Sequence, residues 1–456
     1  MFAAAWLAYF TALQWSVVRF RVAIVLVLTG CTVGLALWQW RRWRVELTPA
    51  SSSAMLAGSA LATLTVPLFS YLSDSGLALA STLLVAGPLV TAALLWSGRA
   101  RAAVAALCTA VVAYAAAAAT AVVSDPAPRI DVWVTLQQAS DALARGESFY
   151  EVQWSGSPGI QDAFTYLPFT AVLLAPGRWL AGDIRWALLV WTLVAALGVW
   201  ALATRTQRGR AAYGPAPGPR WRAAAVVALL LFAPGTLTQV DQAWTEPLLL
   251  AGLVWWAVLV DRGRAWWAVL PLALACASKQ HLALLLPVLL VWRPFGARRA
   301  IATGALTGVL ISPWFLAGPA DFVHDTVSLL VSFHPIRFAN TLYLLALNTW
   351  GVTLPFWLTG LGALGTLGAV VAVVWRRQPG LAELLRWLAL VLLVANLVNK
   401  QAFYNQFWLV GALVLVSLAA ISPAALPARH GRGRSARRGQ GGSRTAPSAT
   451  TSAPAG

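Results

Sequence analysis

Charge is what this sequence lacks most. Only 11% of its 456 residues are Asp, Glu, Lys or Arg, while 59% are hydrophobic; a soluble domain usually carries about 25% charged residues. The hydrophobic residues form runs of about 15 to 22, close to the roughly 20 that a helix needs to cross a bilayer core. The runs show no period-two alternation, which excludes a β-barrel. The composition therefore predicts an all-α, polytopic membrane protein.

Lysine and cysteine are also scarce. The only lysines are Lys279 and Lys400, so the net charge of +18 comes from arginine. The three cysteines, Cys31, Cys108 and Cys276, lie inside apolar runs, and we interpret them as small core residues. Neither a disulfide framework nor a metal site follows from that placement. The N-terminus shows no cleavable signal pattern of the usual polar, apolar and small-residue kind.

The positions of the arginines predict the topology. Arginines cluster at the ends of apolar runs, which marks the cytoplasmic side by the positive-inside rule. In that orientation 24 of the 31 arginines lie inside, five lie outside, and Arg19 and Arg21 stay undecided. Twelve of the fifteen acidic residues then lie outside, so we expect the polar chemistry there. The inside clusters are Arg41/Arg42/Arg44, Arg99/Arg101, Arg205 to Arg222, Arg262/Arg264, Arg293/Arg298/Arg299, Arg376/Arg377 and the tail arginines.

About 12 to 13 transmembrane helices are predicted. The candidate spans are 22–40, 54–72, 77–97, 102–123, 184–203, 223–238, 246–260, 265–278, 281–292, 300–317, 357–375, 384–398 and 403–420. They divide into N-terminal membrane helices (1–123) and a membrane core (184–426), on either side of a large outer loop (124–183). The basic tail, 427–456, cannot bury apolar surface and is expected to be disordered, cytoplasmic and in contact with lipid. No aromatic residues interleave its arginines, so a nucleic-acid partner is not expected.

Two segments predict something other than a simple span. Segment 164–182 lies between the acidic outer loop and the span 184–203, so it begins and ends outside, as a re-entrant or interfacial helix broken by Pro168 and Pro176. Segment 265–292 has basic flanks and must cross twice, in legs that are only about 20 Å long. Its turn, from Ser278 to His281, is therefore expected within the outer half of the membrane.

The outer loop carries the first candidate catalytic residue. Residues 132–144 have an amphipathic helical pattern that fits a helix on the membrane surface, and Asp131 stands at its N-terminal end. Asp131 is interpreted either as a cap of this helix or as a catalytic carboxylate. The two roles are compatible, because a cap fixes the position of the side chain.

Cations at predicted outer helix ends are candidate phosphate contacts. A lysine at membrane depth costs about 2.5–3.5 kcal/mol and usually faces a cavity or a partner. We therefore expect Lys279 either to contact a phosphate or to extend outward to solvent. His281, beside it, is as well explained by a structural role as by a functional one. Lys400 and Arg337 are further candidates for the phosphate contact.

Two polar clusters near predicted outer ends have different interpretations. Gln239 and Asp241 follow a span, and they form either the rim of a pocket for sugar hydroxyls or a solvated loop. Asp321, His324 and Asp325 match no strong metal signature and are expected to form a solvated loop. The sequence therefore predicts no metal and no cofactor.

The order of these residues is similar to that of a known family. Asp131 and Trp133 lie in the outer loop, followed by G-x-x-x-Y at 146–150, Y-x-P-F at 166–169, Q-V-D at 239–241, and Phe338 with Asn340. The chain resembles membrane glycosyltransferases with the C-type fold, especially the family-87 polyprenyl-phosphate-mannose-dependent mannosyltransferases. It departs from that pattern at Leu167, where the family has proline, and in having about four spans before the loop.

The resemblance implies an inverting, metal-independent transfer of a hexose, mannose in that family. The donor would be a polyprenyl-phosphate sugar, and the acceptor a cell-envelope glycolipid or glycan at the outer face of the cell membrane. Asp131 would be the general base, and cations would stabilise the phosphate leaving group. The implied substrate-binding residues are Lys279, His281, Gln239, Asp241, Tyr166, Arg337 and Lys400.

Two other functions fit parts of the sequence. A transporter or flippase for a lipid-linked or polar substrate would also have broken helices and intramembrane polar residues. No internal repeat pairs the two halves of the chain, however, and the long acidic loop is less expected in a transporter. A non-catalytic subunit is the third interpretation, against which Asp131 and Lys279 weigh.

The predicted topology is tested by cysteine-accessibility labelling. We expect cysteines introduced at Asp141 and Asp321 to react with an impermeant reagent added outside the cell. A cysteine at Arg208 should react only from the inside. External reactivity at position 208 would reverse the whole orientation.

Overall fold

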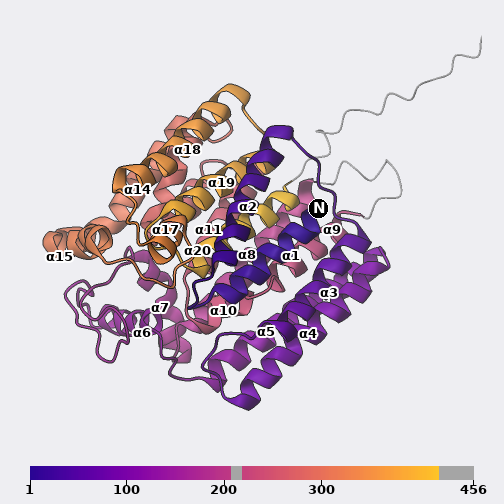
Figure 1. Cartoon of the computed structure of the whole chain (residues 1–456), viewed down its shortest axis with the longest axis horizontal. Helices are drawn as coiled ribbons and strands as arrows, with labels where there is room; N and C mark the ends of the chain where they lie inside the picture. The colour runs from indigo at the N-terminus through magenta and orange to yellow at the C-terminus, as the bar shows by residue number, and fades with distance from the viewer. Residues whose placement is uncertain (207–217, 421–456) are drawn as a thin grey trace, which may run out of the picture. The chain divides into compact units, whose positions relative to one another are not determined.

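The described part of the chain is built from helices. The computed structural model describes residues 1–206 and 218–420, and within them every regular element is a helix (Figure 1). Seven of these helices are long and apolar enough to cross a membrane. The prediction of an all-α polytopic membrane protein is confirmed. Position 208 and the predicted tail of 427–456 lie outside the described residues.

The helices follow the chain in three groups. The first contains α1 (Phe2–Ser16), α2 (Val22–Arg41), α3 (Pro49–Thr65), α4 (Asp74–Trp96) and α5 (Ala100–Ser124). The second contains α6 (Asp131–Ala144) and α7 (Phe169–Ala181). The third contains α8 (Arg185–Thr206), α9 (Pro219–Leu231), α10 (Thr236–Asp241), α11 (Glu246–Asp261), α12 (Val269–Cys276), η1 (Gln280–Leu285), α13 (Leu286–Val291), α14 (Gly296–Ala317), α15 (Pro319–Val323), η2 (His324–Ser328), α16 (Leu329–Ser332), α17 (Leu342–Trp350), α18 (Phe356–Arg377), α19 (Leu381–Val398) and α20 (Tyr404–Ala419).

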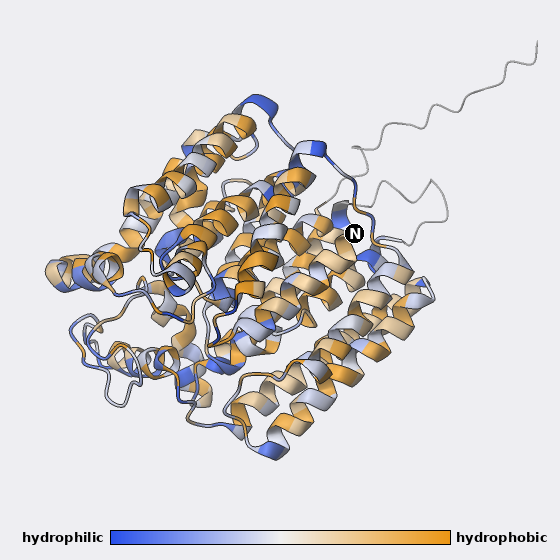
Figure 2. Cartoon of the chain, viewed as in Figure 1, coloured by the Kyte–Doolittle hydropathy of each residue, from blue (hydrophilic) through white to orange (hydrophobic). Residues whose placement is uncertain are grey.

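Hydropathy explains why these segments are helices. The long helices are apolar along most of their length, and hydrophilic residues gather at helix ends and in the connections (Figure 2). A helix in lipid satisfies its own backbone hydrogen bonds, which an irregular chain at that depth cannot do. Each predicted span contains or overlaps a helix, and the segment 223–238 divides between α9 and α10 at Gly235. Helix α1 was not among the predicted spans.

Three details differ from the prediction. Helix α7 begins directly after Pro168 but continues through Pro176, so the predicted break at Pro176 is wrong. The lost backbone bond is tolerated because one missing N–H does not end a helix that packs on its neighbours, here α6 and α8. Cys108 is exposed on α5 rather than placed in the core. Asp131 is the first residue of α6, and the N-cap position belongs to Ile130.

One end of the helix bundle gathers ends that the arginines assign to the cytoplasm. The indole of Trp292, after α13, donates to the carbonyl of Pro379, after α18, at 2.8 Å. Gln39, near the end of α2, donates to the carbonyl of Glu383 in α19 at 2.9 Å. Each contact joins helix ends that the sequence places on the same side, so the predicted alternation of the spans is consistent with their packing.

The opposite end fastens the α1–α2 turn to the chain between α16 and α17. Asn340 donates to the carbonyl of Arg19 at 2.7 Å and accepts from the N–H of Arg21 at 3.1 Å. At the same end, Lys400 donates to the carbonyls of Val331 and Phe333 at 2.6 and 2.7 Å. The two arginines left undecided by the sequence therefore lie at the end that the sequence predicts to be outside.

A buried ion pair ties α6 to the bundle. Arg185, at the start of α8, is fully buried, and its guanidinium lies 2.7 Å from the carboxylate of Asp183. It also donates to the carbonyl of Asp125, after α5, at 2.5 Å. The Asp183 carboxylate in turn accepts the indole N–H of Trp133, in α6, at 3.1 Å. Three helices thus converge on one guanidinium.

Removal of the Asp183 charge should destabilise the fold. Breaking a buried pair leaves an uncompensated charge, at a cost of about 3–5 kcal/mol. We expect Asp183→Asn to lower the midpoint of unfolding clearly when the purified protein is titrated with sodium dodecyl sulfate. The matched control is Glu147→Gln, because Glu147 pairs with Arg145 at a site where both side chains are about half exposed. Equal midpoints for the two variants would contradict the role given to the buried pair.

Candidate active site

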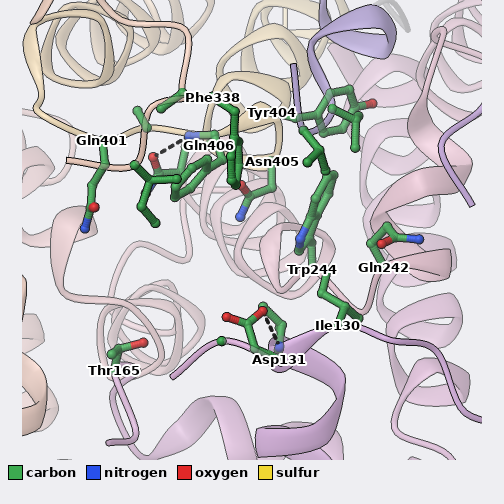
Figure 3. A pocket seen from close by; sticks show the side chains of 18 of the residues that line it. Ile130, Asp131, Thr165, Gln242, Trp244, Phe338, Gln401, Tyr404, Asn405 and Gln406 are labelled. Carbon is green, nitrogen blue, oxygen red and sulfur yellow. Dashed lines mark hydrogen bonds between the residues drawn. The ribbon is translucent and has the colours of Figure 1, made fainter. Parts of the chain in front are cut away.

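A cavity of about 580 Å³ opens among the helix ends that Asn340 and Lys400 hold together. Its wall is made by the end of α1, residues 69 and 71, residues 129–132 at the start of α6, residues 158–160 and 165–166, the α10–α11 turn, the 279–281 turn, and residues 329–330, 333, 336, 338–340, 399 and 401–407. Figure 3 shows Asp131 on one side of this space and Trp244, Asn405 and Gln406 on the other. Widely separated parts of the chain therefore line one cavity.

Asp131 reaches the cavity from the first turn of α6. Its Oδ1 accepts the N–H of Val132 at 2.9 Å, so the carboxylate is oriented by the helix start, although no capping bond of the usual spacing forms. Residue 159 must be glycine here, since a Cβ at Gly159 would lie 2.5 Å from the Asp131 carboxylate. Burial raises the pKa of the Asp131 carboxyl, while the N–H groups of Val132 and Ile160 favour its charged form.

The charges around the cavity are few. Asp131 is the one carboxylate among the described residues of its wall. The cations of the wall are Arg129, two residues earlier in the chain, and Lys279, with the imidazole of His281 next to it. A wall with a single base and two cations suits a reaction that removes a proton at one atom and releases an anion at another.

Lys279 is held by a residue that the sequence did not pair with it. Its ammonium lies 2.5 Å from the carboxylate of Glu246, which is fully buried at the start of α11. It also donates to Thr245 at 3.3 Å and lies 5.4 Å from the ring centre of Tyr166. A lysine at this depth was expected to face a cavity or a partner, and it does both. The predicted phosphate contact is untested, and the charge it would use is already partly balanced.

Motif residues near Tyr166 support the cavity from behind. Tyr150 donates its hydroxyl to the carbonyl of Tyr166 at 2.8 Å, and its ring packs on Phe164, 5.6 Å away. Gly146, after α6, has a φ of +72°, a left-handed conformation that favours glycine. Tyr166 itself lines the cavity. The G-x-x-x-Y and Y-x-P motifs therefore shape the turn that brings Tyr166 beneath Lys279.

Four of the predicted substrate-binding residues do not line the cavity. Gln239 and Asp241 are buried on α10, behind the wall rather than on it. Lys400 uses its ammonium on two backbone carbonyls of the rim. Arg337 is exposed, and its carbonyl accepts from Asn348 at 2.8 Å. Their predicted roles in binding stay untested, while the structure brings Asp131, Tyr166, Lys279 and His281 together.

Several residues of the site, on the cavity wall or directly behind it, were not assigned a role from the sequence. Arg129 was counted only as an outer arginine, although its position two residues before Asp131 could have marked it. Glu246 is the first residue of an apolar helix. Charged residues at membrane depth usually pair with one another, so its pairing with Lys279 could have been predicted. Trp244 and Asn405 gave no signal, because only the fold brings the α10–α11 turn and the start of α20 together.

One protein family and two solved structures are similar to this chain. The description of Glycosyltransferase family 87 matches residues 164–399, just over half of the chain. Among solved structures, ArnT from Cupriavidus metallidurans bound to undecaprenyl phosphate is similar with a TM-score of 0.43 and 16% identity, over 63% of this chain and 55% of that one. The same protein in the apo state gives a TM-score of 0.40 and 14% identity, over 63% and 54%.

The two structural matches span only about half the length of the solved chains. No curated protein sequence matches this chain. The family match covers the chain from Phe164, before α7, to Asn399, after α19, and so includes Tyr166, Lys279 and His281. The extent of that match shows that the chain belongs to glycosyltransferase family 87.

Proposed function

We propose that this chain transfers a hexose, mannose in the form we favour, from a polyprenyl-phosphate donor to a hydroxyl of a cell-envelope glycolipid or glycan. The observation that carries the proposal is the cavity with Asp131 as its one described carboxylate and with Arg129 and Lys279 as its cations. Family membership supports the reaction class. The solved ArnT bound to undecaprenyl phosphate is in keeping with a lipid-phosphate donor.

The reaction follows from the charges. The acceptor hydroxyl attacks the anomeric carbon of the donor sugar, and its proton passes to the Asp131 carboxylate. The bond from that carbon to the phosphate oxygen breaks, so the electron pair leaves with the polyprenyl phosphate. Arg129 and Lys279 stabilise this anion, which therefore needs no proton from a general acid. Attack from the side opposite the phosphate inverts the anomeric configuration.

The environment of Asp131 suits a base. A general base works best when its pKa lies near the working pH, and burial moves the pKa of Asp131 in that direction. Gly159 and the N–H of Val132 hold the carboxylate in place. Positioning of this kind lowers the entropic cost of the reaction.

The outer face is proposed as the side of the reaction. The cavity lies at the end of the bundle where Asn340 meets Arg19 and Arg21, opposite the ends that carry most of the arginines. By the positive-inside rule, that arginine-rich end faces the cytoplasm. A polyprenyl donor would then enter from the outer leaflet.

Asp131→Asn should separate catalysis from folding. Loss of a positioned general base is expected to lower transfer by about 10²-fold or more, measured with labelled polyprenyl-phosphate mannose and extracted envelope glycolipid. A raised pKa in the folded state means that the charged Asp131 disfavours folding at neutral pH. The Asn variant should therefore melt at the same temperature as the wild type, or higher.

The pH profile and a control complete this test. Wild-type transfer should fall as the pH drops through the pKa of Asp131, because the protonated acid accepts no proton; the Asn variant should lack this limb. Asp162→Asn, an exposed acid of the same loop, should retain full activity. Full activity in the Asp131 variant would remove it as the base and direct attention to Asp141, Glu147 and Glu151.

A double variant tests the phosphate role of Lys279 apart from its ion pair. Lys279→Met alone should lower stability, because it leaves the Glu246 carboxylate buried and unpaired, at a cost of about 3–5 kcal/mol. It should also lower donor affinity, because the proposed contact with the phosphate is lost. Adding Glu246→Gln removes that charge and should restore most of the stability. If Lys279 binds the donor phosphate, donor affinity stays low in the double variant. Recovery of both properties would assign Lys279 to structure alone.

A further inference from the structure

The wall across the cavity from Asp131 has no formal charge. Trp244 stands there, with Asn405 beside it and the ring of Tyr404 behind (Figure 3). The rings of Trp244 and Tyr404 are 5.1 Å apart between centroids and tilted by 30°. The figure shows the indole nitrogen of Trp244 on the cavity side. Among the described residues, none accepts a hydrogen bond from that indole N–H.

The backbone is strained to present this indole. Ala243 has a φ of +56°, a left-handed conformation that is uncommon for residues other than glycine. Strain of this kind persists where the surroundings enforce it, and it gathers at ligand sites. The backbone N–H of Trp244 donates to the backbone carbonyl of Gln239 at 2.8 Å, and this bond closes the turn.

Tyr404 is held equally firmly. It is buried, and its hydroxyl lies so close to Gly235 that a Cβ at that position would collide with it. Gly235 also has a φ of +83°. The Trp244 ring therefore rests on a fixed aromatic surface, and it is in position before any ligand arrives. A preorganised wall loses little entropy when it binds.

The amide of Asn405, beside the indole, has no partner among the described residues, and that of Gln242 has one. Asn405 is 8% exposed and lines the cavity, and its side chain bonds to none of the residues in the described part of the chain. Gln242 is fully buried; its Nε2 donates to Asp241 at 2.7 Å, while its Oε1 has no described partner. A buried polar atom without a partner costs free energy unless a ligand or water satisfies it. The Asn405 amide, which lines the cavity, therefore indicates a ligand with hydroxyl groups.

We propose that Trp244 and Asn405 form the subsite for a neutral pyranose ring, a proposal that rests on the proposed function. The indole N–H and the Asn405 amide bond to the hydroxyls of the ring. This wall carries no formal charge, so a hexose fits it better than an amino sugar or a uronic acid. The phosphate of the donor is left to the side of Arg129 and Lys279. The ring belongs to the donor or to the acceptor.

The test compares two lipids in the full-length protein. Dissociation constants are measured for polyprenyl-phosphate mannose and for the sugar-free polyprenyl phosphate, with wild type, Trp244→Leu and Asn405→Leu. The matched control is Trp267→Leu, because Trp267 is 70% exposed and lies away from the cavity. Trp244→Phe keeps the packing on Tyr404 and serves if the leucine variant fails to fold.

If the ring is the donor's, Trp244→Leu and Asn405→Leu should each weaken binding of the sugar-bearing lipid about tenfold or more, the usual scale for a buried partner lost. Binding of the sugar-free lipid should stay unchanged. If the ring is the acceptor's, both lipids should bind as before, and the KM for extracted envelope glycolipid should rise by a similar factor. The control variant should match wild type throughout.

Two results would overturn the subsite. One is equal weakening of both lipids, which would mean that the wall is merely structural. The other is unchanged affinity for both lipids together with an unchanged acceptor KM. Failure of the proposed function looks different, because it appears in the wild type: no preference for the sugar-bearing lipid and no transfer. That result would remove the subsite as well.

Discussion

The position of the candidate base depends on an ion pair that it does not touch. Arg185 and Asp183 form a pair buried among α5, α6 and α8, and the indole N–H of Trp133 completes it. Trp133 lies two residues after Asp131, so the pair sets where α6 begins and where the carboxylate stands. Charges buried in an apolar surrounding are strongly destabilising unless paired. Packings of α6 and α8 that separate Arg185 from Asp183 are therefore disfavoured.

The cavity separates charged from neutral chemistry. Arg129, Asp131 and Lys279 supply its charges, while Trp244 and Asn405 form a neutral wall across from Asp131. This division matches a substrate with an anionic end and an uncharged ring. A transporter would also need a polar space between helices, but a lone positioned carboxylate with cations on the same cavity wall is the arrangement that proton removal and anion release require.

The sequence was sufficient for the helices and for part of the site. Apolar runs and arginine clusters depend on neighbouring residues, so α2, α4 and α5 were predictable, as was Asp131 at the head of α6. The ion pair between Lys279 and Glu246 and the stack of Trp244 on Tyr404 join residues 33 to 160 positions apart, and no local pattern encodes such contacts. Lys400 was predicted to contact a phosphate from its position at a helix end. The local sequence could not predict that its ammonium donates to a backbone carbonyl instead.

The hydrogen bonds of Asn340 to the α1–α2 turn bear on what counts as the catalytic unit. The region that matches the family begins at residue 164, yet Asp131 precedes it, and the end of α1 with Phe69 and Tyr71 contributes to the cavity wall. The boundary drawn by resemblance is therefore not a boundary of the molecule. The N-terminal helices build part of the wall of this cavity, so a fragment that began at residue 164 would lack both the candidate base and that part of the wall.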